Sequence, residues 1–280
     1  MSIHTWYGFK DDSFSEVNNW IDDSGNHTAP GNADSVYFTK RAVHGCRSGG
    51  SGQGASNYVD LVVGPEYNHD IGRGSDPLTC SADVVQISGG RNIYLAKGSG
   101  VFDDITVRTG NVIAINFSNA SSTWQILGGS VFTLGNGTKV MGTVLVDGGN
   151  GTFEGTVTTL ILKWGSVKMD KSSVLTTGNV DGGALRWHGD TLTLLNQNGG
   201  TVFDNSEAPP ATHVLNGGLY TFRENNWGTT AIDINVLDVF GGSVDTRTGY
   251  ANVGTNGATV TVHNDAVLWG FDAGRTVGIT

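Results

Sequence analysis

The sequence predicts an all-β protein with a parallel β-helix (β-solenoid) fold. Pairs of glycines recur along the chain, an apolar segment with a period of two follows most pairs, and a second apolar stretch precedes them. A period of two is that of a strand, on which successive side chains point to opposite faces. A motif that recurs at a nearly constant spacing marks a repeat architecture. Each repeat is therefore expected to contain a strand, a glycine corner and a second strand.

The glycine pairs are expected to form the corners of successive coils. From Gly128 onward their spacings are 20, 16, 18, 17, 18 and 24 residues, and Thr109-Gly110 divides the wider gap that precedes. Glycine suits a corner because it reaches positive φ without a Cβ clash and lets backbones approach closely. The pairs are Gly89-Gly90, Gly128-Gly129, Gly148-Gly149, the degenerate Trp164-Gly165, Gly182-Gly183, Gly199-Gly200, Gly217-Gly218 and Gly241-Gly242.

The second residue after most pairs is expected to face inward, and the third mostly to face solvent. One coil cannot bury its apolar row alone, whereas stacked coils bury a ladder of like residues. A β-sandwich or jelly roll is the alternative, since it also consists of short strands separated by turns. The repetition of one motif in register favours the β-helix. The predicted inward column is Val131, Val167, Leu185, Val202, Tyr220 and Val244.

The first part of the chain does not repeat and is predicted to be an N-terminal cap with a glycine-rich loop. We assign residues 1–57 to this cap or attachment region and residues 58–280 to the solenoid. Terminal units of solenoids differ from internal ones because an open ladder would template aggregation. An aromatic cluster in the cap suits either a cover for the solenoid mouth or an attachment interface for a partner. Its members are Trp6, Tyr7, Phe9, Phe14 and Trp20.

Charge and composition exclude several classes of partner. The chain has 16 basic and 26 acidic residues, a net charge of -10, so it lacks the basic footprint that nucleic acids and anionic membranes require. Met1–Trp6 lacks the pattern of a secretory signal, and no apolar run approaches the length of a membrane span. We therefore expect synthesis in a host cytoplasm without export. Because the chain is also rich in asparagine and threonine, acidic and poor in lysine, as exposed durable proteins are, we expect its release through lysis, as for virion proteins.

Six stretches in the first quarter of the chain form two recognisable groups: Asn19-Trp20, Pro30-Gly31 and Asp34–Phe38, then Asp60–Val63, Tyr67 and Ile71-Gly72. Both groups resemble parts of β-helix proteins of bacteriophages. The group that ends at Phe38 is similar to the opening of many secreted and phage β-helix proteins. The group that begins at Asp60 is similar to a stretch common in proteins of tailed phages. The resemblance implies a virion structural protein, such as a head decoration, fibre or spike. The partners it implies are a major capsid or tail protein, further copies of the chain (for example in a homotrimer) and host surface glycans.

No metal or cofactor is predicted from the residues that could bind one. His44, Cys46, His69 and Cys80 are of types that bind zinc, but their spacing matches no common zinc frame. Without export, Cys46 and Cys80 are expected to be free thiols, and a disulfide formed after lysis is the alternative. The glycine-rich run Gly49–Gly54 is not followed by Lys-Ser/Thr and indicates a surface loop.

Dispersed carboxylates favour a protein without catalytic activity. Glycoside hydrolysis needs two carboxyls roughly 5 to 9.5 Å apart, which acids on neighbouring coils could provide. Asp204 and Glu224, near Trp187, Phe203 and Trp227, come closest to that arrangement. The alternative function is therefore a carbohydrate-binding or polysaccharide-depolymerising protein, a glycoside hydrolase or lyase. The candidate acids are Asp103, Asp104, Glu154, Asp170, Asp204, Glu207 and Glu224.

Overall fold

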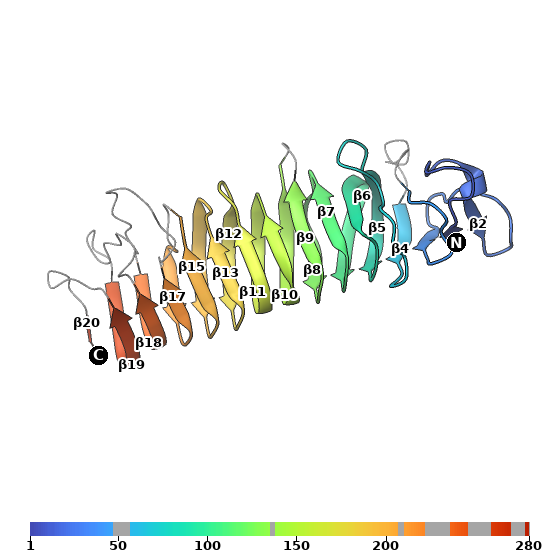
Figure 1. Cartoon of the computed structure of the whole chain (residues 1–280). Coiled ribbons are helices and arrows are strands. Elements are labelled where there is room, and N and C mark those ends of the chain that lie inside the picture. Colours follow the sequence, from blue (N-terminus) through green and yellow to red (C-terminus); the bar gives the residue numbers. More distant parts are fainter. Residues whose placement is uncertain are drawn as a thin grey trace. The chain divides into compact units, whose positions relative to one another are not determined.

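Parallel strands that pair with the next turn of the chain dominate the structure (Figure 1). The computed structural model describes residues 1–46, 57–134, 138–206, 210–221, 236–245, 259–269 and 278–279. Among these residues the one helix is a short 3-10 helix, η1 (Val17–Asn19), and the strand pairs along residues 57–134 and 156–279 are parallel. The predicted parallel β-helix with a non-repeating N-terminal portion is confirmed, and the sandwich alternative is wrong.

The chain divides into two compact units, Met1–Gly142 and Thr143–Thr280. The predicted cap, residues 1–57, is therefore part of a larger first unit. Strands of the first unit are β1 (Ile3–Trp6), β2 (Trp20–Asp22), β3 (Ser35–Phe38), β4 (Asn57–Val63), β5 (Leu78–Ile87), β6 (Asn92–Val107), β7 (Asn111–Ile115), β8 (Ser118–Ile126) and β9 (Ser130–Leu134). The later strands are β10 (Val140–Phe153), β11 (Thr156–Met169), β12 (Val174–Val180), β13 (Ala184–Trp187), β14 (Thr191–Gln197), β15 (Thr201–Asp204), β16 (Thr212–Leu215), β17 (Leu219–Thr221), β18 (Val236–Asp245), β19 (Thr259–Trp269) and β20 (Gly278–Ile279).

The predicted inward column exists in the second unit. The backbone register joins its members in sequence order across β11, β13, β15, β17 and β18. All are at most 1% exposed, so the sequence register is confirmed. The column is Val167, Leu185, Val202, Tyr220 and Val244.

Val131 belongs to the corresponding column of the first unit. Cys46, Ile71, Ile93 and Val112 precede it, each paired with the next turn. All five side chains are buried. One rule of side-chain placement therefore operates in both units.

The outward row of the second unit follows the prediction only in part. Lys168, Arg186 and Phe203 pair with one another in successive turns and keep solvent contact. Thr221 and Asp245 continue this row but are 1% and 8% exposed. The exposed part of the row therefore ends at Phe203.

At most corners between the two strands of a turn, glycine occupies two successive positions where a Cβ would clash with backbone. At the first position, a Cβ on Gly217 would lie 2.6 Å from the carbonyl oxygen of Asn198 in the preceding turn. At the second position, Gly200 has a φ of +68°, and a Cβ there would lie 2.6 Å from the carbonyl oxygen of Gly183. Neither contact can relax without moving backbone, because the neighbouring atom is a backbone oxygen.

The cap continues the ladder of the first unit and then ends it. β1 pairs in parallel with β3, and β3 pairs in parallel with β4, so the cap strands already share the solenoid register. On its other edge, β1 pairs with the short antiparallel β2. A short strand that occupies the edge limits pairing with another chain. The cap is thus non-repeating in sequence, but its backbone is joined to the first turns.

Alanine substitutions can separate the two reasons for glycine at the corner. Gly25 has a φ of +87° with no atom within 4 Å of a built Cβ, whereas Gly129 has a φ of +67° and a Cβ there would meet the carbonyl oxygen of Gly110 at 2.5 Å. Gly25→Ala should lower the free energy of unfolding by about 1 to 2 kcal/mol, the cost of the left-handed conformation. Gly129→Ala should cost about 1 to 3 kcal/mol more, because it adds the steric clash. Urea denaturation of both variants measures the difference, and equal losses would refute the close approach of the corners.

Candidate functional site

The structure splits the aromatic cluster that was predicted to cover the solenoid mouth or to form an attachment interface. Trp6, Phe14 and Trp20 are fully buried. The indoles of Trp6 and Trp20 meet edge to face with a centroid separation of 5.0 Å. The N–H of Trp6 donates to the backbone carbonyl of His44, and that of Trp20 to the carbonyl of Phe14. These three side chains therefore form the core of the cap. They offer no surface to a partner while the cap is folded.

The remaining two members, Tyr7 and Phe9, lie at the surface of the cap. Phe9 is 51% exposed, and its ring stacks on that of Tyr7 with a centroid separation of 4.9 Å. Backbone hydrogen bonds with Asn19 and Val43 hold Tyr7 on both sides. The candidate attachment interface thus narrows to this stacked pair, and its role in attachment stays a prediction.

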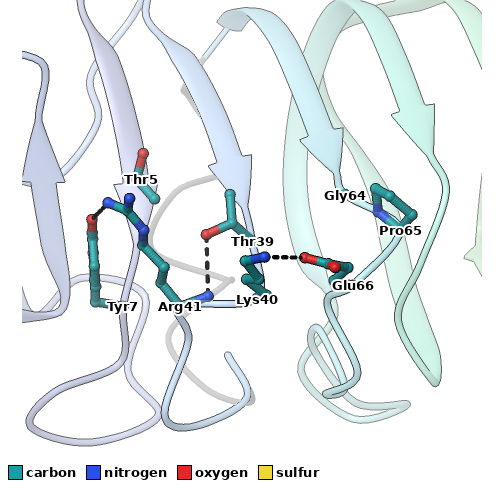
Figure 2. A pocket seen from close by; sticks show the side chains of 8 residues that line it. All are labelled: Thr5, Tyr7, Thr39, Lys40, Arg41, Gly64, Pro65 and Glu66. Atoms are coloured by element: carbon teal, nitrogen blue, oxygen red, sulfur yellow. Dashed lines mark hydrogen bonds and ion pairs between the residues drawn. The ribbon is translucent and has the colours of Figure 1, made fainter.

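Beside Tyr7 lies a groove of about 420 Å³, the cap groove (Figure 2). Three segments that each follow a strand meet there, because the carboxyl ends of parallel β1, β3 and β4 reach the same edge. Sequence analysis identified only Tyr7, since the other residues belong to no motif and come together only through the strand register. The lining residues are Thr5, Tyr7, Thr39, Lys40, Arg41, Gly64, Pro65 and Glu66.

The cap groove carries one cation without a carboxylate partner among the described residues. Lys40 Nζ lies 2.8 Å from Glu66 Oε2, so these two charges form an exposed ion pair. Arg41 Nη1 instead donates to the Tyr7 hydroxyl at 3.0 Å (Figure 2). This hydrogen bond raises the pKa of the Arg41 guanidinium. The groove therefore presents a positioned guanidinium beside an aromatic ring.

Asp204, the acid that sequence analysis placed in a candidate pair, is not at the surface. It pairs with Trp187 of the preceding turn and shares that residue's inward direction, so it is fully buried. Its carboxylate accepts hydrogen bonds from the Tyr220 hydroxyl at 2.5 Å and from Ser206. Burial raises the pKa of Asp204 to about 6. A polysaccharide cannot reach this carboxylate in the folded chain, and Glu224 lies outside the described residues.

Two other acids occupy equivalent positions on successive turns. The backbone N–H of Asp170 donates to Phe153 O at 2.9 Å, which sets Asp170 beside Glu154. In the next turn, the backbone N–H of His188 donates to Met169 O in the same way, which sets His188 beside Asp170. These three residues, Glu154, Asp170 and His188, form the outer row of the second unit, and the backbones of neighbours in it lie one strand spacing, ~4.8 Å, apart.

Charged and aromatic side chains lie close to the outer row. Lys168 Nζ is 2.7 Å from Asp170 Oδ1. Arg186 lies over the ring of Phe203, with the guanidinium carbon 5.5 Å from the ring centroid. The arrangement offers two carboxyls, an imidazole and one aromatic ring on adjacent turns, which is a surface suited to polar ligands.

The other candidate residues are separate. Asp103 and Asp104 are exposed in the first unit, whereas Glu207 lies outside the described residues, as does Trp227. Cys46 and Cys80 are buried free thiols, and burial raises the pKa of Cys80 to about 12. Within the described ranges no group of three or more His, Cys, Asp or Glu side chains could hold a metal ion.

Comparison with known proteins leaves the structure as the main guide to function. No protein-family model matches the sequence, and neither a curated protein nor a solved structure shows significant similarity to it. Across the described part of the chain, no helix has the length and apolar character that crossing a membrane would require.

A buried histidine was not anticipated from the sequence. His213 pairs with Leu195 and Leu237 in an inward column, is fully buried, and has no hydrogen-bond partner at either ring nitrogen among the described residues. Its ring contacts that of Tyr220 at 4.3 Å. Burial lowers the pKa of His213 to about 3 from 6.5. The folded chain therefore holds this histidine neutral.

His213→Leu should make the chain more stable, most of all in acid. Because the folded pKa is lower than the unfolded one, stability from neutral His213 is complete above pH 6.5 and is lost as pH falls toward 3. Leucine matches its neighbours in the column and removes a buried unpaired polar group, a gain of about 1 to 3 kcal/mol. Denaturation at pH 7 and pH 4 should show a larger gain at pH 4, whereas exposed His27→Leu serves as the control. An equal gain at both pH values would contradict the burial of a neutral imidazole.

Asp204→Asn tests a residue whose contribution to stability falls as pH rises, the opposite of His213. The folded pKa of Asp204, about 6, is above the ordinary aspartate value of 3.8, so the stability that its protonated form contributes is complete below pH 3.8 and is lost as pH rises through 6. The variant should therefore lose less stability than the parent chain between pH 4 and pH 7. Denaturation midpoints across that range measure it, and a slope unchanged from the parent would refute the raised pKa.

Proposed function

We propose that the chain is a non-enzymatic structural component of a bacteriophage particle. Its place would be on the capsid exterior or the tail, where it stabilises the shell or presents a surface to the host. The proposal rests on the resemblance of the first quarter to phage β-helix proteins and on the way the fold uses its residues. The chain would be made in the host cytoplasm and assembled with other virion proteins.

The single observation that carries the proposal is the continuous use of each turn for stacking. In the second unit, every corner from Gly182-Gly183 to Gly241-Gly242 places glycine against backbone of the preceding turn, and the inward column below it is buried. Such a scaffold resists deformation because each turn is hydrogen-bonded and packed against its neighbours. Rigidity together with an acidic surface suits a protein that stands on a crowded assembly.

Partners of this kind would include a major capsid or tail protein and further copies of the chain, with a homotrimer as the expected oligomer. Phe9, which is 51% exposed and stacks on Tyr7, supports a contact through the cap, since an exposed aromatic side chain favours an interface. Deletion of residues 1–20 is a poor test of that contact, because it would also remove the buried Trp6 and Trp20.

Particles should carry the chain. We expect the protein to cosediment with intact particles on a density gradient of a lysate from the producing host, in a fixed ratio to the main shell or tail protein. Quantitative mass spectrometry of the gradient fractions measures that ratio, and labelled antibody locates the chain on the particle by electron microscopy. A chain found only in the soluble fractions of a lysate that contains intact particles would refute the virion role.

A second candidate function is supported by the outer row of Glu154, Asp170 and His188. Two carboxyls on adjacent turns, whose backbones lie about one strand spacing apart, could reach the separation that glycoside hydrolysis uses. Arg186 on Phe203 adds an aromatic surface of the kind that binds sugars. The ion pair of Asp170 with Lys168 favours a structural role for this acid, because it already neutralises the charge. We therefore place carbohydrate binding or cleavage at this row second.

Incubation with host capsular and cell-wall polysaccharides separates the two functions. We expect no sustained release of oligosaccharides, measured by reducing-end assay and chromatography over several hours. Release that is lost in both Glu154→Gln and Asp170→Asn, but kept in the exposed-acid control Asp103→Asn, would establish a depolymerase. In that outcome the non-enzymatic proposal fails.

A further inference from the structure

We propose that the cap groove binds an acidic saccharide, with the Arg41 guanidinium receiving the sugar carboxylate and the Tyr7 ring lying against the sugar. The inference rests on the host-facing part of the proposed function, and it names the class of ligand. It concerns the groove of the first unit and makes no use of the outer row that carries the second candidate function.

The guanidinium of Arg41 is held in place before any ligand arrives. Its side chain is exposed, and Nη1 donates to the Tyr7 hydroxyl (Figure 2). Tyr7 is itself fixed by two backbone hydrogen bonds and by the stacked ring of Phe9. Arginine has five N–H donors in a planar fork, so one bond to Tyr7 leaves donors for a carboxylate. Less entropy is lost on binding when the receiving group is already oriented.

Local charge selects an anion in spite of the acidic chain. The net charge of the protein is -10, yet the cap groove contains Lys40, Arg41 and a single carboxylate, that of Glu66. Lys40 and Glu66 neutralise each other at 2.8 Å. The groove therefore keeps one positive charge, which favours a ligand with a carboxylate. The surrounding acidic surface would oppose a ligand that carries many negative charges.

The shape and lining of the groove suit a sugar ring. Its volume of about 420 Å³ lies in the range of small-ligand sites, roughly 300 to 1,000 Å³. Thr5 and Thr39 contribute hydroxyl groups from the β1 and β3 segments, and Tyr7 contributes a ring. Hydroxyls that can donate or accept, together with an aromatic surface, match the alternating polar edge and apolar face of a pyranose. An acidic peptide would use the guanidinium but would gain less from the two hydroxyls.

Binding to defined oligosaccharides tests the proposal on the full chain. The probes are oligogalacturonate, a hyaluronan tetrasaccharide and oligosialic acid, each measured by calorimetry against its methyl ester, which keeps the ring and removes the charge. At least one acid should bind, and its ester should bind at least about tenfold more weakly, since charge-assisted hydrogen bonds are the strong ones. Arg41→Gln should weaken the same acid about tenfold or more, and Tyr7→Ala should also weaken it. Arg108→Gln, an exposed arginine of the same unit, should leave binding unchanged.

Three results would overturn the proposal. They are binding of none of the three acids, equal binding of acid and ester, and binding of a tetraglutamate peptide as tight as that of the best acid, which would assign the groove to an acidic protein segment. Arg41 is exposed, so its replacement leaves the core intact, and circular dichroism verifies the fold. Particle association of Arg41→Gln is measured separately. A chain that stays on particles but binds no acid rejects only the ligand, whereas a chain that binds the acid but is absent from particles rejects only the virion role.

Discussion

Successive corners of this chain approach one another so closely that a hydrogen atom, and not a methyl group, fits between them. Gly200 shows both sides of the constraint, because its φ of +68° disfavours any L side chain and a Cβ there would meet the carbonyl oxygen of Gly183. Repeated in each turn, this contact sets how far one turn lies from the next within a unit. The buried columns follow from it, since residues at equal distances from the corner then stack in register. Leu185 on Val167 is one such pair.

The same register determines which side chains can act together. Glu154, Asp170 and His188 are distant in sequence and neighbours in the fold because each follows an inward residue by one position. Asp204 pairs with Trp187 of the preceding turn and is buried for the same reason, because both face inward. The buried carboxylate then accepts hydrogen bonds from Tyr220 and Ser206. In the first unit, parallel pairing brings the ends of β1, β3 and β4 to one edge, which creates the cap groove. Function in this fold depends on rows and edges more than on local motifs.

Much of the fold could be predicted from the sequence because glycine pairs and period-two segments carry direct physical meaning. The outer row could also have been found, since its members each lie six residues after the first residue of a corner pair. They are Glu154, Asp170 and His188. The cap groove could not, because Lys40, Arg41 and Glu66 follow strands whose register is set by tertiary pairing. The inward position of His213 could also have been found, since it lies four residues before Gly217, as Leu195 lies before Gly199 and Leu237 before Gly241. The loss of hydrogen-bond partners at its ring within the described part of the chain could not, because that depends on the packing of the column.

The close approach of the corners can be measured directly by nuclear magnetic resonance on the isotope-labelled chain. In the second unit, the account predicts nuclear Overhauser contacts between the Hα protons of Gly183 and residues 199–200, and between those of Gly200 and residues 217–218, in an unbroken series. These contacts join residues 16 to 18 positions apart and have no counterpart in a sandwich. Contacts displaced by one residue, or an absence of contacts between consecutive corners in a folded and fully assigned chain, would contradict the glycine-corner account.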